Sequence, residues 1–298
     1  MLAQGMQAGQ WDAQLDLEIA NREQGARLTS CHRRGPLHVQ KAFFPEGKDL
    51  AHLYILHPPG GLVSGDSLTV NARVGDGSHA LITTPGAGRL YSARETSSVQ
   101  TQNNILSISP EASLEWFPME TLFYSGSLGV SKTRIDIDQG GKFMGWDICC
   151  LGLPASEQPF VEGELRQRFE INYAGKADWF ERWNFRADDL TFLNSKIGLQ
   201  GNSCNGVFVA GPFSSDSNSG DSDPSIPPET YQELQTLCQM FRDQNLGLAG
   251  VSFADKWLAV RYLGASAAHA RDLFAKAWAL LRPILLERQA VPPRIWKC

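Results

Sequence analysis

Apolar and polar residues alternate through the first two-thirds of the chain. Residues 13–20 alternate in this way, and residues 67–74 repeat the pattern. Because successive side chains of a strand point to opposite faces, such alternation predicts half-buried β-strands. Further runs are predicted as strands at 35–40, 53–56, 78–84, 99–102, 104–108, 113–116, 132–138, 142–148 and 165–171.

Turn-forming residues separate these runs at short intervals. Clusters of Gly, Pro, Asn or Ser lie between them, and no helical pattern of useful length occurs before about residue 225. This spacing is typical of layered antiparallel sheets and not of βαβ units. The pattern alone therefore predicts a mainly β fold with many short strands in layers.

Two helices are predicted in the last third of the chain. The first begins at Pro227-Pro228 and ends before Gly247, and the second covers about 266–282, where Pro283 is expected to bend or end it. Both carry apolar stripes at helical spacing, which we expect to face the core. The stripe residues are Leu234, Leu237, Cys238 and Phe241 in the first helix, and Leu273, Ala277, Leu280, Leu281 and Ile284 in the second.

A low-complexity segment lies between the strand-rich and helix-rich parts. Residues 214–223 are mostly Ser and Asp and include no apolar residue. Such a segment cannot contribute to a core, so we expect a mobile acidic loop. The remainder of residues 1–298 is expected to form a single domain.

Composition narrows the class of protein. The 298 residues include 27 Lys and Arg against 32 Asp and Glu, a formal net charge of −5, which gives no basic footprint for nucleic acid or an anionic membrane. No apolar run approaches the ~20 residues that span a bilayer, and the N-terminus lacks the features of a secretory signal. We therefore expect a cytoplasmic protein without a nucleic-acid or membrane partner.

The cysteines and histidines do not form a recognisable metal motif. The six cysteines show no CxxC spacing, and the six histidines show neither HxH nor HExxH. Neighbouring Cys149 and Cys150 would point to opposite faces of a strand, as would His52 and His57. A stable metal site is therefore not predicted.

The most unusual stretch is the Gly- and Pro-rich run 57–67. Its second half matches the phosphate-binding pattern GxxxxGK[ST], except that Asp66 stands where the pattern has Lys. A carboxylate there would repel phosphate, and a strand rather than a helix is predicted to follow, so nucleotide binding is excluded. Two interpretations stay open: Asp66 caps backbone N–H groups of a tight turn, or it is a buried functional carboxylate.

No catalytic constellation accompanies this loop. The chain has no GxSxG motif, and the serines in glycine-flanked turns have no identifiable base. The residues alone therefore favour a binding or scaffold protein.

Six motifs in fixed order resemble the UreD (UreH) family of urease accessory proteins. They are HPPGGLVSGD at 57–66, LITTPGAGRLYSA at 81–93, LEWFPMETLFYSGS at 114–127, RYLG at 261–264, W..LRP at 278–283 and PRIW at 293–296. The resemblance implies a mainly β fold in which many short strands form a layered, helical arrangement, with two α-helices in the C-terminal third.

The resemblance also implies a function without catalysis. Members of the family act as maturation scaffolds that bind apo-urease and the accessory proteins UreF and UreG. The GTPase UreG delivers nickel, and the UreD-like protein is expected to provide a polar passage for the ion. No permanently bound cofactor is implied, only nickel in transit.

Individual residues are carried over from the family motifs. Asp66 is the carboxylate of the GGxxxGD motif, with Gly60, Gly61 and Gly65 as its structural glycines. Thr84 belongs to the TTPGA segment, whose Pro85 and Gly86 are also expected to be structural. Glu181, followed by Arg182, resembles the acidic member of a pair in the family.

Asp66, Glu181 and Thr84 are therefore expected to line the ion passage. The competing interpretations are a structural role for both carboxylates, in salt bridges or caps, and a β-rich hydrolase that uses Asp66 and Glu181 as acid and base. Departures from the family pattern include the TTPGA segment, which usually continues into a Lys and here has Arg89 nearby as a cationic substitute, and the acidic segment 214–223, which resembles an insertion.

Overall fold

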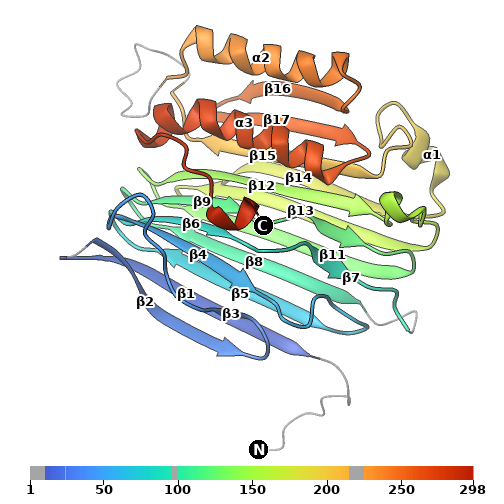
Figure 1. Cartoon of the computed structure of the whole chain (residues 1–298), viewed down its shortest axis with the longest axis horizontal. Coiled ribbons are helices and arrows are strands. Elements are labelled where there is room, and N and C mark those ends of the chain that lie inside the picture. The colour runs from blue at the N-terminus through green and yellow to red at the C-terminus, as the bar shows by residue number, and fades with distance from the viewer. Residues whose placement is uncertain (1–10, 24, 95–98, 215–224, 298) are drawn as a thin grey trace, which may run out of the picture.

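Two β-sheets and a layer of helices make up the fold, seen in a computed structural model that describes residues 11–23, 25–94, 99–214 and 225–297 (Figure 1). In the smaller sheet the strands follow the spatial order β14 (Lys176–Arg186), β13 (Gly163–Tyr173), β11 (Ser127–Ile137), β8 (Gln100–Ile108), β5 (Ser67–Val74), β1 (Asp12–Arg22) and β2 (Gly25–Arg34).

The larger sheet follows the order β16 (Leu248–Ala254), β17 (Trp257–Gly264), β15 (Cys204–Gly211), β12 (Lys142–Leu151), β9 (Ser113–Phe117), β6 (His79–Thr83), β4 (Leu50–Leu56) and β3 (His38–Val39). The short strands β10 (Thr121–Phe123) and β7 (Gly88–Leu90) join it beside β12.

The chain alternates between the two sheets. It passes from β4 to β5, from β6 to β8, from β9 to β11 and from β12 to β13, and each turn adds one parallel strand to each sheet. The fold is thus the mainly β, helical arrangement of short strands that the family resemblance implies. The prediction of antiparallel sheets from strand spacing alone is wrong for this central part. Each connecting loop leads to the opposite sheet, so neighbouring strands within one sheet run parallel.

Antiparallel pairing occurs at the two ends of this coil of strands. At the N-terminal end β2 pairs with β1. At the C-terminal end β14 pairs with β13 in one sheet, while β15, β16 and β17 extend the other. The strands at these two ends, β2, β14, β15, β16 and β17, were not predicted, and the predicted strands 99–102 and 104–108 are the single strand β8.

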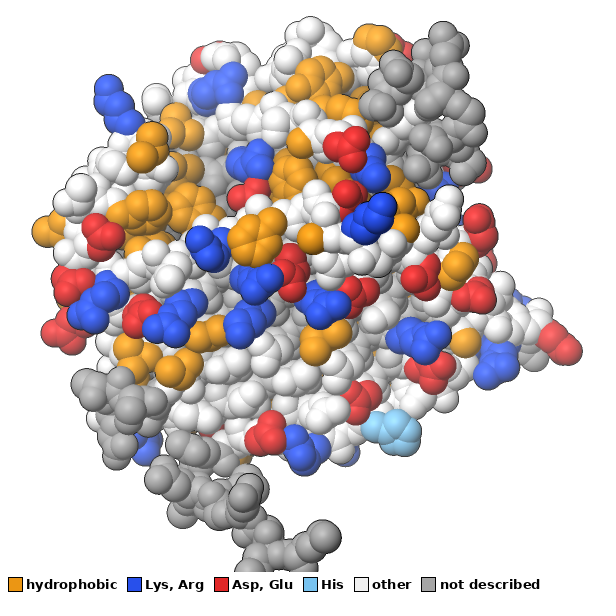
Figure 2. All heavy atoms as spheres, turned by 180° about the vertical axis from the view of Figure 1, so that it is seen from behind, with side chains coloured by type: hydrophobic (Ala, Val, Ile, Leu, Met, Phe, Trp, Pro, Cys, Tyr) orange, Lys and Arg blue, Asp and Glu red, His pale blue; other side chains and the backbone are white. Residues whose placement is uncertain are grey.

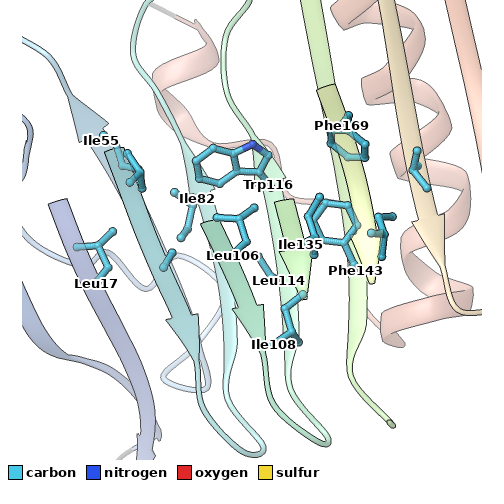
Figure 3. Close-up of a cluster of buried hydrophobic side chains, with 14 of the residues drawn as sticks. Leu17, Ile55, Ile82, Leu106, Ile108, Leu114, Trp116, Ile135, Phe143 and Phe169 are labelled. Carbon is cyan, nitrogen blue, oxygen red and sulfur yellow. The ribbon is translucent and has the colours of Figure 1, made fainter. Parts of the chain in front are cut away.

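The inner faces of the two sheets form the larger hydrophobic cluster. Leu106 and Ile135 of one sheet face Leu114 and Trp116 of the other, as Figure 3 shows. In β11 every second residue is buried, since alternate side chains point into the space between the sheets. The alternation in the sequence therefore reflects this interior.

The outer face of the smaller sheet is polar and of mixed charge. Figure 2 shows Lys and Arg side chains interspersed with Asp and Glu across this side of the molecule. Ion pairs join residues two apart on the same strand, such as Arg134 with Asp136 and Arg168 with Glu170. A surface of alternating charges keeps this broad sheet solvated.

Helices cover the outer face of the larger sheet. Helix α3 (Ala267–Leu286) packs on β12, β15 and β17, and α2 (Pro228–Asp243) packs beside it on β16 (Figure 1). Shorter elements are α1 (Leu190–Asn194), η1 (Pro154–Ser156) and η2 (Arg294–Lys297). In the described residues, none of the helices is long and apolar enough to cross a bilayer.

Both predicted long helices are confirmed, with one change. Helix α3 does not end at Arg282 but continues through Pro283 for another turn. Leu285 in that turn is fully buried, and its burial offsets the backbone hydrogen bond that Pro283 cannot donate. The predicted acidic loop 214–223 lies, apart from Ser214, outside the described residues.

A buried ion cluster joins α3 to the larger sheet. The guanidinium of Arg282 is fully buried and donates from Nε and Nη2 to both Glu115 oxygens at 2.9 Å. It also donates to both oxygens of Glu46, at 2.6 and 3.0 Å. Trp278 Nε1 donates to Glu115 at 2.6 Å, and His52 Nε2 lies 2.8 Å from Glu46. Burial raises the pKa of Glu115, while Arg282 opposes that shift.

Removing the cation of this cluster should be strongly destabilising. Arg282→Ala leaves two carboxylates buried without their partner, and such a change typically lowers the free energy of unfolding by about 3–5 kcal/mol. Urea unfolding monitored by circular dichroism measures the loss. The matched control is Arg134→Ala, whose exposed ion pair should contribute less than about 1 kcal/mol. Equal losses in the two variants would contradict a special role for the cluster.

Candidate functional site

Two pockets are lined by predicted site residues, and the first lies beside the Gly-rich loop. This loop pocket has a volume of about 220 Å³ and opens between the loops 57–62 and 84–89. Backbone hydrogen bonds between Leu62 and the 89–91 segment hold the two loops together. Its lining includes His57, Gly60, Thr84, Pro85, Gly86, Arg89, Gln102, Asn104, Trp116 and Thr121.

Thr84 fixes one wall of the loop pocket. Its hydroxyl donates to the Gly86 carbonyl at 3.1 Å and accepts from the backbone N–H of Met119 at 2.9 Å. Pro85 and Gly86 belong to the same lining. The TTPGA segment is therefore a loop whose shape is set by Thr84.

Asp66 holds the Gly-rich loop, which forms the other side of the loop pocket, through hydrogen bonds to the backbone. Its side chain is buried, and its two oxygens accept backbone N–H groups of Trp11 and Val63, each at 2.9 Å. Burial lowers the pKa of His57, which lines the loop pocket, and the charge of Asp66 opposes that change. Asp66 thus caps the turn and also acts electrostatically on the pocket.

The glycines of this motif meet backbone requirements. Gly60 and Gly65 each have a φ of +80°, a conformation that residues with a Cβ rarely adopt. A Cβ on Gly61 would lie 2.5 Å from the Tyr91 ring. All three positions therefore require glycine for the loop to have this shape.

The second pocket lies between the C-terminal edges of the two sheets. This edge pocket has a volume of about 260 Å³ between β14 on one side and β16 and β17 on the other. Glu181 faces it and accepts a hydrogen bond from Arg261 Nη2 at 2.5 Å. Its lining includes Asp147, Gln167, Phe169, Glu181, Trp183, Asn205, Arg261 and Tyr262.

A row of polar side chains runs inside the coil between the two pockets. Ser131 of β11 pairs in register with Gln102 of β8 and with Gln167 of β13. We call these three residues the inner polar row. Gln102 lines the loop pocket and Gln167 lines the edge pocket, so the row crosses two strand spacings, about 10 Å, between them. Asn104 and Thr133, hydrogen-bonded at 3.0 Å, lie one step along the same strands.

An ionisable side chain, Asp147, lies at the end of this row that faces the edge pocket. It belongs to β12, whose side chains Phe143 and Cys149 share its inner face. Burial raises its pKa to about 6, and a hydrogen bond with Gln167 opposes that shift. Asp147 Oδ2 and Gln167 Oε1 have no hydrogen-bond partner in the described protein. Two buried oxygens at the edge pocket are thus available to a ligand.

Asp66 and Glu181 do not come together. Asp66 immediately precedes β5, whereas Glu181 lies on β14, four strands away in the same sheet. Four strand spacings are about 19 Å, whereas the acid and base carboxylates of glycoside hydrolases, for example, are at most about 9.5 Å apart. The geometry therefore gives no support to a hydrolase that uses these two residues as a pair.

Sequence reasoning missed Asp147, Gln167 and the inner polar row. A signal was present, because Ile135 and Ile137 fix which residues of their strand point inward, and Ser131 and Thr133 share that phase. No group of three or more His, Cys, Asp or Glu side chains suited to a metal ion occurs among the described residues. The arrangement offers scattered oxygen donors.

Comparison with known proteins gives one consistent result. The family model described as UreD urease accessory protein matches residues 12–297. A protein named urease accessory protein UreD from Marinomonas sp. (strain MWYL1) is 39% identical, over 97% of this chain and 90% of its own. A protein of the same name from Psychromonas ingrahamii is 38% identical, over 96% and 94%. Urease accessory protein UreD 1 from Psychrobacter cryohalolentis is also 38% identical, over 96% and 91%.

The buried carboxyl of Asp147 should make stability depend on pH. Its pKa is about 6 in the folded protein against an ordinary 3.8, so the folded state binds the proton more tightly. This contribution is fully present below pH 4 and is lost as the pH rises through 6, a loss of about 3 kcal/mol.

Asp147→Asn removes that titration. The variant should therefore gain stability relative to the unmodified protein as the pH rises from about 4 to about 8. Urea unfolding at the two pH values gives the difference directly. Asp188→Asn, at an exposed carboxylate, is the control and should show little of this trend. A difference between Asp147→Asn and the unmodified protein that stays constant with pH would contradict the assignment.

Proposed function

The chain belongs to the UreD family of urease accessory proteins, and on that premise we propose that it is a non-catalytic scaffold for nickel delivery to apo-urease. The observation that carries this proposal is the family match over residues 12–297. In this proposal the whole chain acts as one domain in the cytoplasm. It binds apo-urease, UreF and UreG, and the GTP chemistry belongs to UreG.

The inner polar row supports a passage for the ion. Loop pocket and edge pocket lie at its two ends, with Thr84 at one and Glu181 at the other. Buried polar atoms without a hydrogen-bond partner reduce stability, so the unpartnered oxygens of Gln167 and Asp147 at the end of this row call for a compensating role. Transit of a hydrated cation is the role that we propose.

The donor chemistry suits transit better than storage. The amides, hydroxyl and carboxylates of Gln102, Ser131, Gln167, Asp147 and Glu181 offer only oxygen. Nickel binds imidazole or thiolate ligands more firmly than such oxygens, so an oxygen-lined path would release the ion. With a pKa of about 6, Asp147 is mostly charged at neutral pH and attracts cations.

Asp66 has a supporting position in this proposal. Its oxygens hold the turn that forms the rim of the loop pocket, and its negative charge acts on His57. It would therefore shape the entrance and attract cations there. Gly60, Gly61 and Gly65 keep the same rim in place.

The first test is dependence of urease maturation on this chain. Urease subunits are co-expressed in nickel medium with UreF, UreG and the remaining accessory proteins, with or without the chain. Without it, the nickel content and activity of purified urease should fall to near background, because the ion does not reach the apo-enzyme. Metal analysis and ammonia release measure the two quantities. Full activation without the chain would refute the proposal.

The second test addresses the passage. Asp147→Asn and Glu181→Gln keep side-chain size but remove charge, so urease activation should fall several-fold while UreF and UreG still co-purify. Because Asp147→Asn should be at least as stable as the unmodified protein at neutral pH, misfolding would not explain its loss. Arg168→Gln, which changes the outward-facing neighbour of Gln167, is the control.

Asp66→Ala distinguishes the rim from the path. It should lower activation too, with partners still bound, since the loop-pocket rim and its charge are both altered. Unchanged activation with Asp147→Asn and Glu181→Gln would rule out the proposed path. Unchanged activation with Asp66→Ala alone would rule out only the role of the rim.

A further inference from the structure

Two cysteines face each other across β12 and β15. Cys150 and Cys204 are directly opposite in the antiparallel register, and Cys150 Sγ donates a hydrogen bond to Cys204 Sγ at 3.2 Å. They are 54 residues apart in the sequence, so only the fold brings the two thiols together. Neither UreD-type scaffolding nor ion transit uses them.

The backbone around this pair has the geometry that a disulfide requires. Leu151 N–H donates to the Ser203 carbonyl at 2.7 Å, so the hydrogen bonds lie on either side of Cys150 and Cys204 rather than between them. Opposite residues at such a position have Cα atoms about 4.5 Å apart, which lies within the range that disulfides span. The strands would not have to separate or slide to form the bond.

The other cysteines are placed differently. Cys149 points to the opposite face of β12, into the space between the sheets, as predicted. Cys238 is a buried thiol on α2 in the same cluster as Cys150 and Cys204, and Cys31 is exposed on β2. The described part of the chain therefore offers a facing pair, two other buried thiols for comparison and one exposed thiol.

We propose that Cys150 and Cys204 are a site of reversible oxidation, which a peroxide converts to a disulfide between β12 and β15. The sulfur of one cysteine attacks a peroxide oxygen, the O–O bond breaks, and a sulfenic acid and one water form. The second thiol attacks the sulfenic sulfur, the S–S bond forms, the S–O bond breaks, and a second water leaves. Two thiols are oxidised and one hydrogen peroxide is reduced.

The environment of the pair makes this reaction slow. Both side chains are buried beneath the helical layer, and the hydrogen bond from Cys150 together with burial raises the pKa of Cys204. Since the thiolate is the reactive form, exposed Cys31 should react with peroxide first. The resulting disulfide would close the chain segment that holds β13, β14 and α1, which includes one wall of the edge pocket.

The experiment maps cysteines in the full chain after oxidation. Reduced protein is treated with hydrogen peroxide, free thiols are blocked with N-ethylmaleimide, and tryptic and chymotryptic peptides are identified without reduction. The expected product joins the peptide of Cys149 and Cys150 to that of Cys204. It should form in Cys149→Ala and Cys238→Ala, disappear in Cys150→Ala and Cys204→Ala, and revert with dithiothreitol.

A stability measurement gives an independent readout. Closing a long loop should raise the midpoint of thermal unfolding by about 5 °C on oxidation, and Cys204→Ala should abolish the rise. Circular dichroism establishes whether each variant is folded. If Cys150→Ala or Cys204→Ala fails to fold, the peptide maps of Cys149→Ala and Cys238→Ala still show whether Cys150 and Cys204 form the disulfide. Two results would overturn the proposal. One is that Cys150 and Cys204 are still found as free thiols after Cys31 has been oxidised, and the other is a disulfide between Cys149 and Cys150.

Discussion

Arg282 places a full positive charge where water does not reach, and the arrangement around it has to neutralise that charge. Its planar guanidinium donates hydrogen bonds to Glu115 on β9 and to Glu46 in the segment before β4, and these bonds tie α3 to the larger sheet. The neighbouring rings of Trp278, Phe117 and Trp296 pack in edge contacts that extend this anchoring to the C-terminal turn. Because α3 covers the outer face of the larger sheet, this cluster anchors the helical layer to that sheet.

That interior is divided along the length of its strands. Toward the ends of β8 and β11 the inward positions are Leu106, Ile108, Ile135 and Ile137, a fully apolar layer. Earlier in the same strands they are polar and form the inner polar row. The apolar layer supplies the burial that stabilises the coil, and this in turn allows the other half to hold side chains that reduce stability. Structure and proposed function thus occupy different halves of the same strands.

Much of the fold could be predicted from the sequence. Strands β1 and β5 have one buried and one outward face, so their alternation is visible without a structure. The direction of pairing could not be predicted, because alternation is the same in parallel and antiparallel sheets, and only the path of each turn decides. At the site, motif resemblance led to Thr84 and Glu181, which line the two pockets. Asp147 was missed because a lone carboxylate in a strand usually points outward, and Arg282 because its partners are distant in sequence, although a charge on the apolar stripe of a helix was a usable signal.

The coil has a further consequence for how such proteins can vary. Each turn contributes one strand to each sheet and contacts mainly its two neighbours, as in other repeat architectures. A whole turn of the coil gained or lost in the middle would lengthen or shorten the interior by one strand spacing, about 4.8 Å, and leave the antiparallel strands at the two ends intact. The distance between the two pockets can therefore change only in steps of one strand spacing, because the number of coil turns between the pockets sets it.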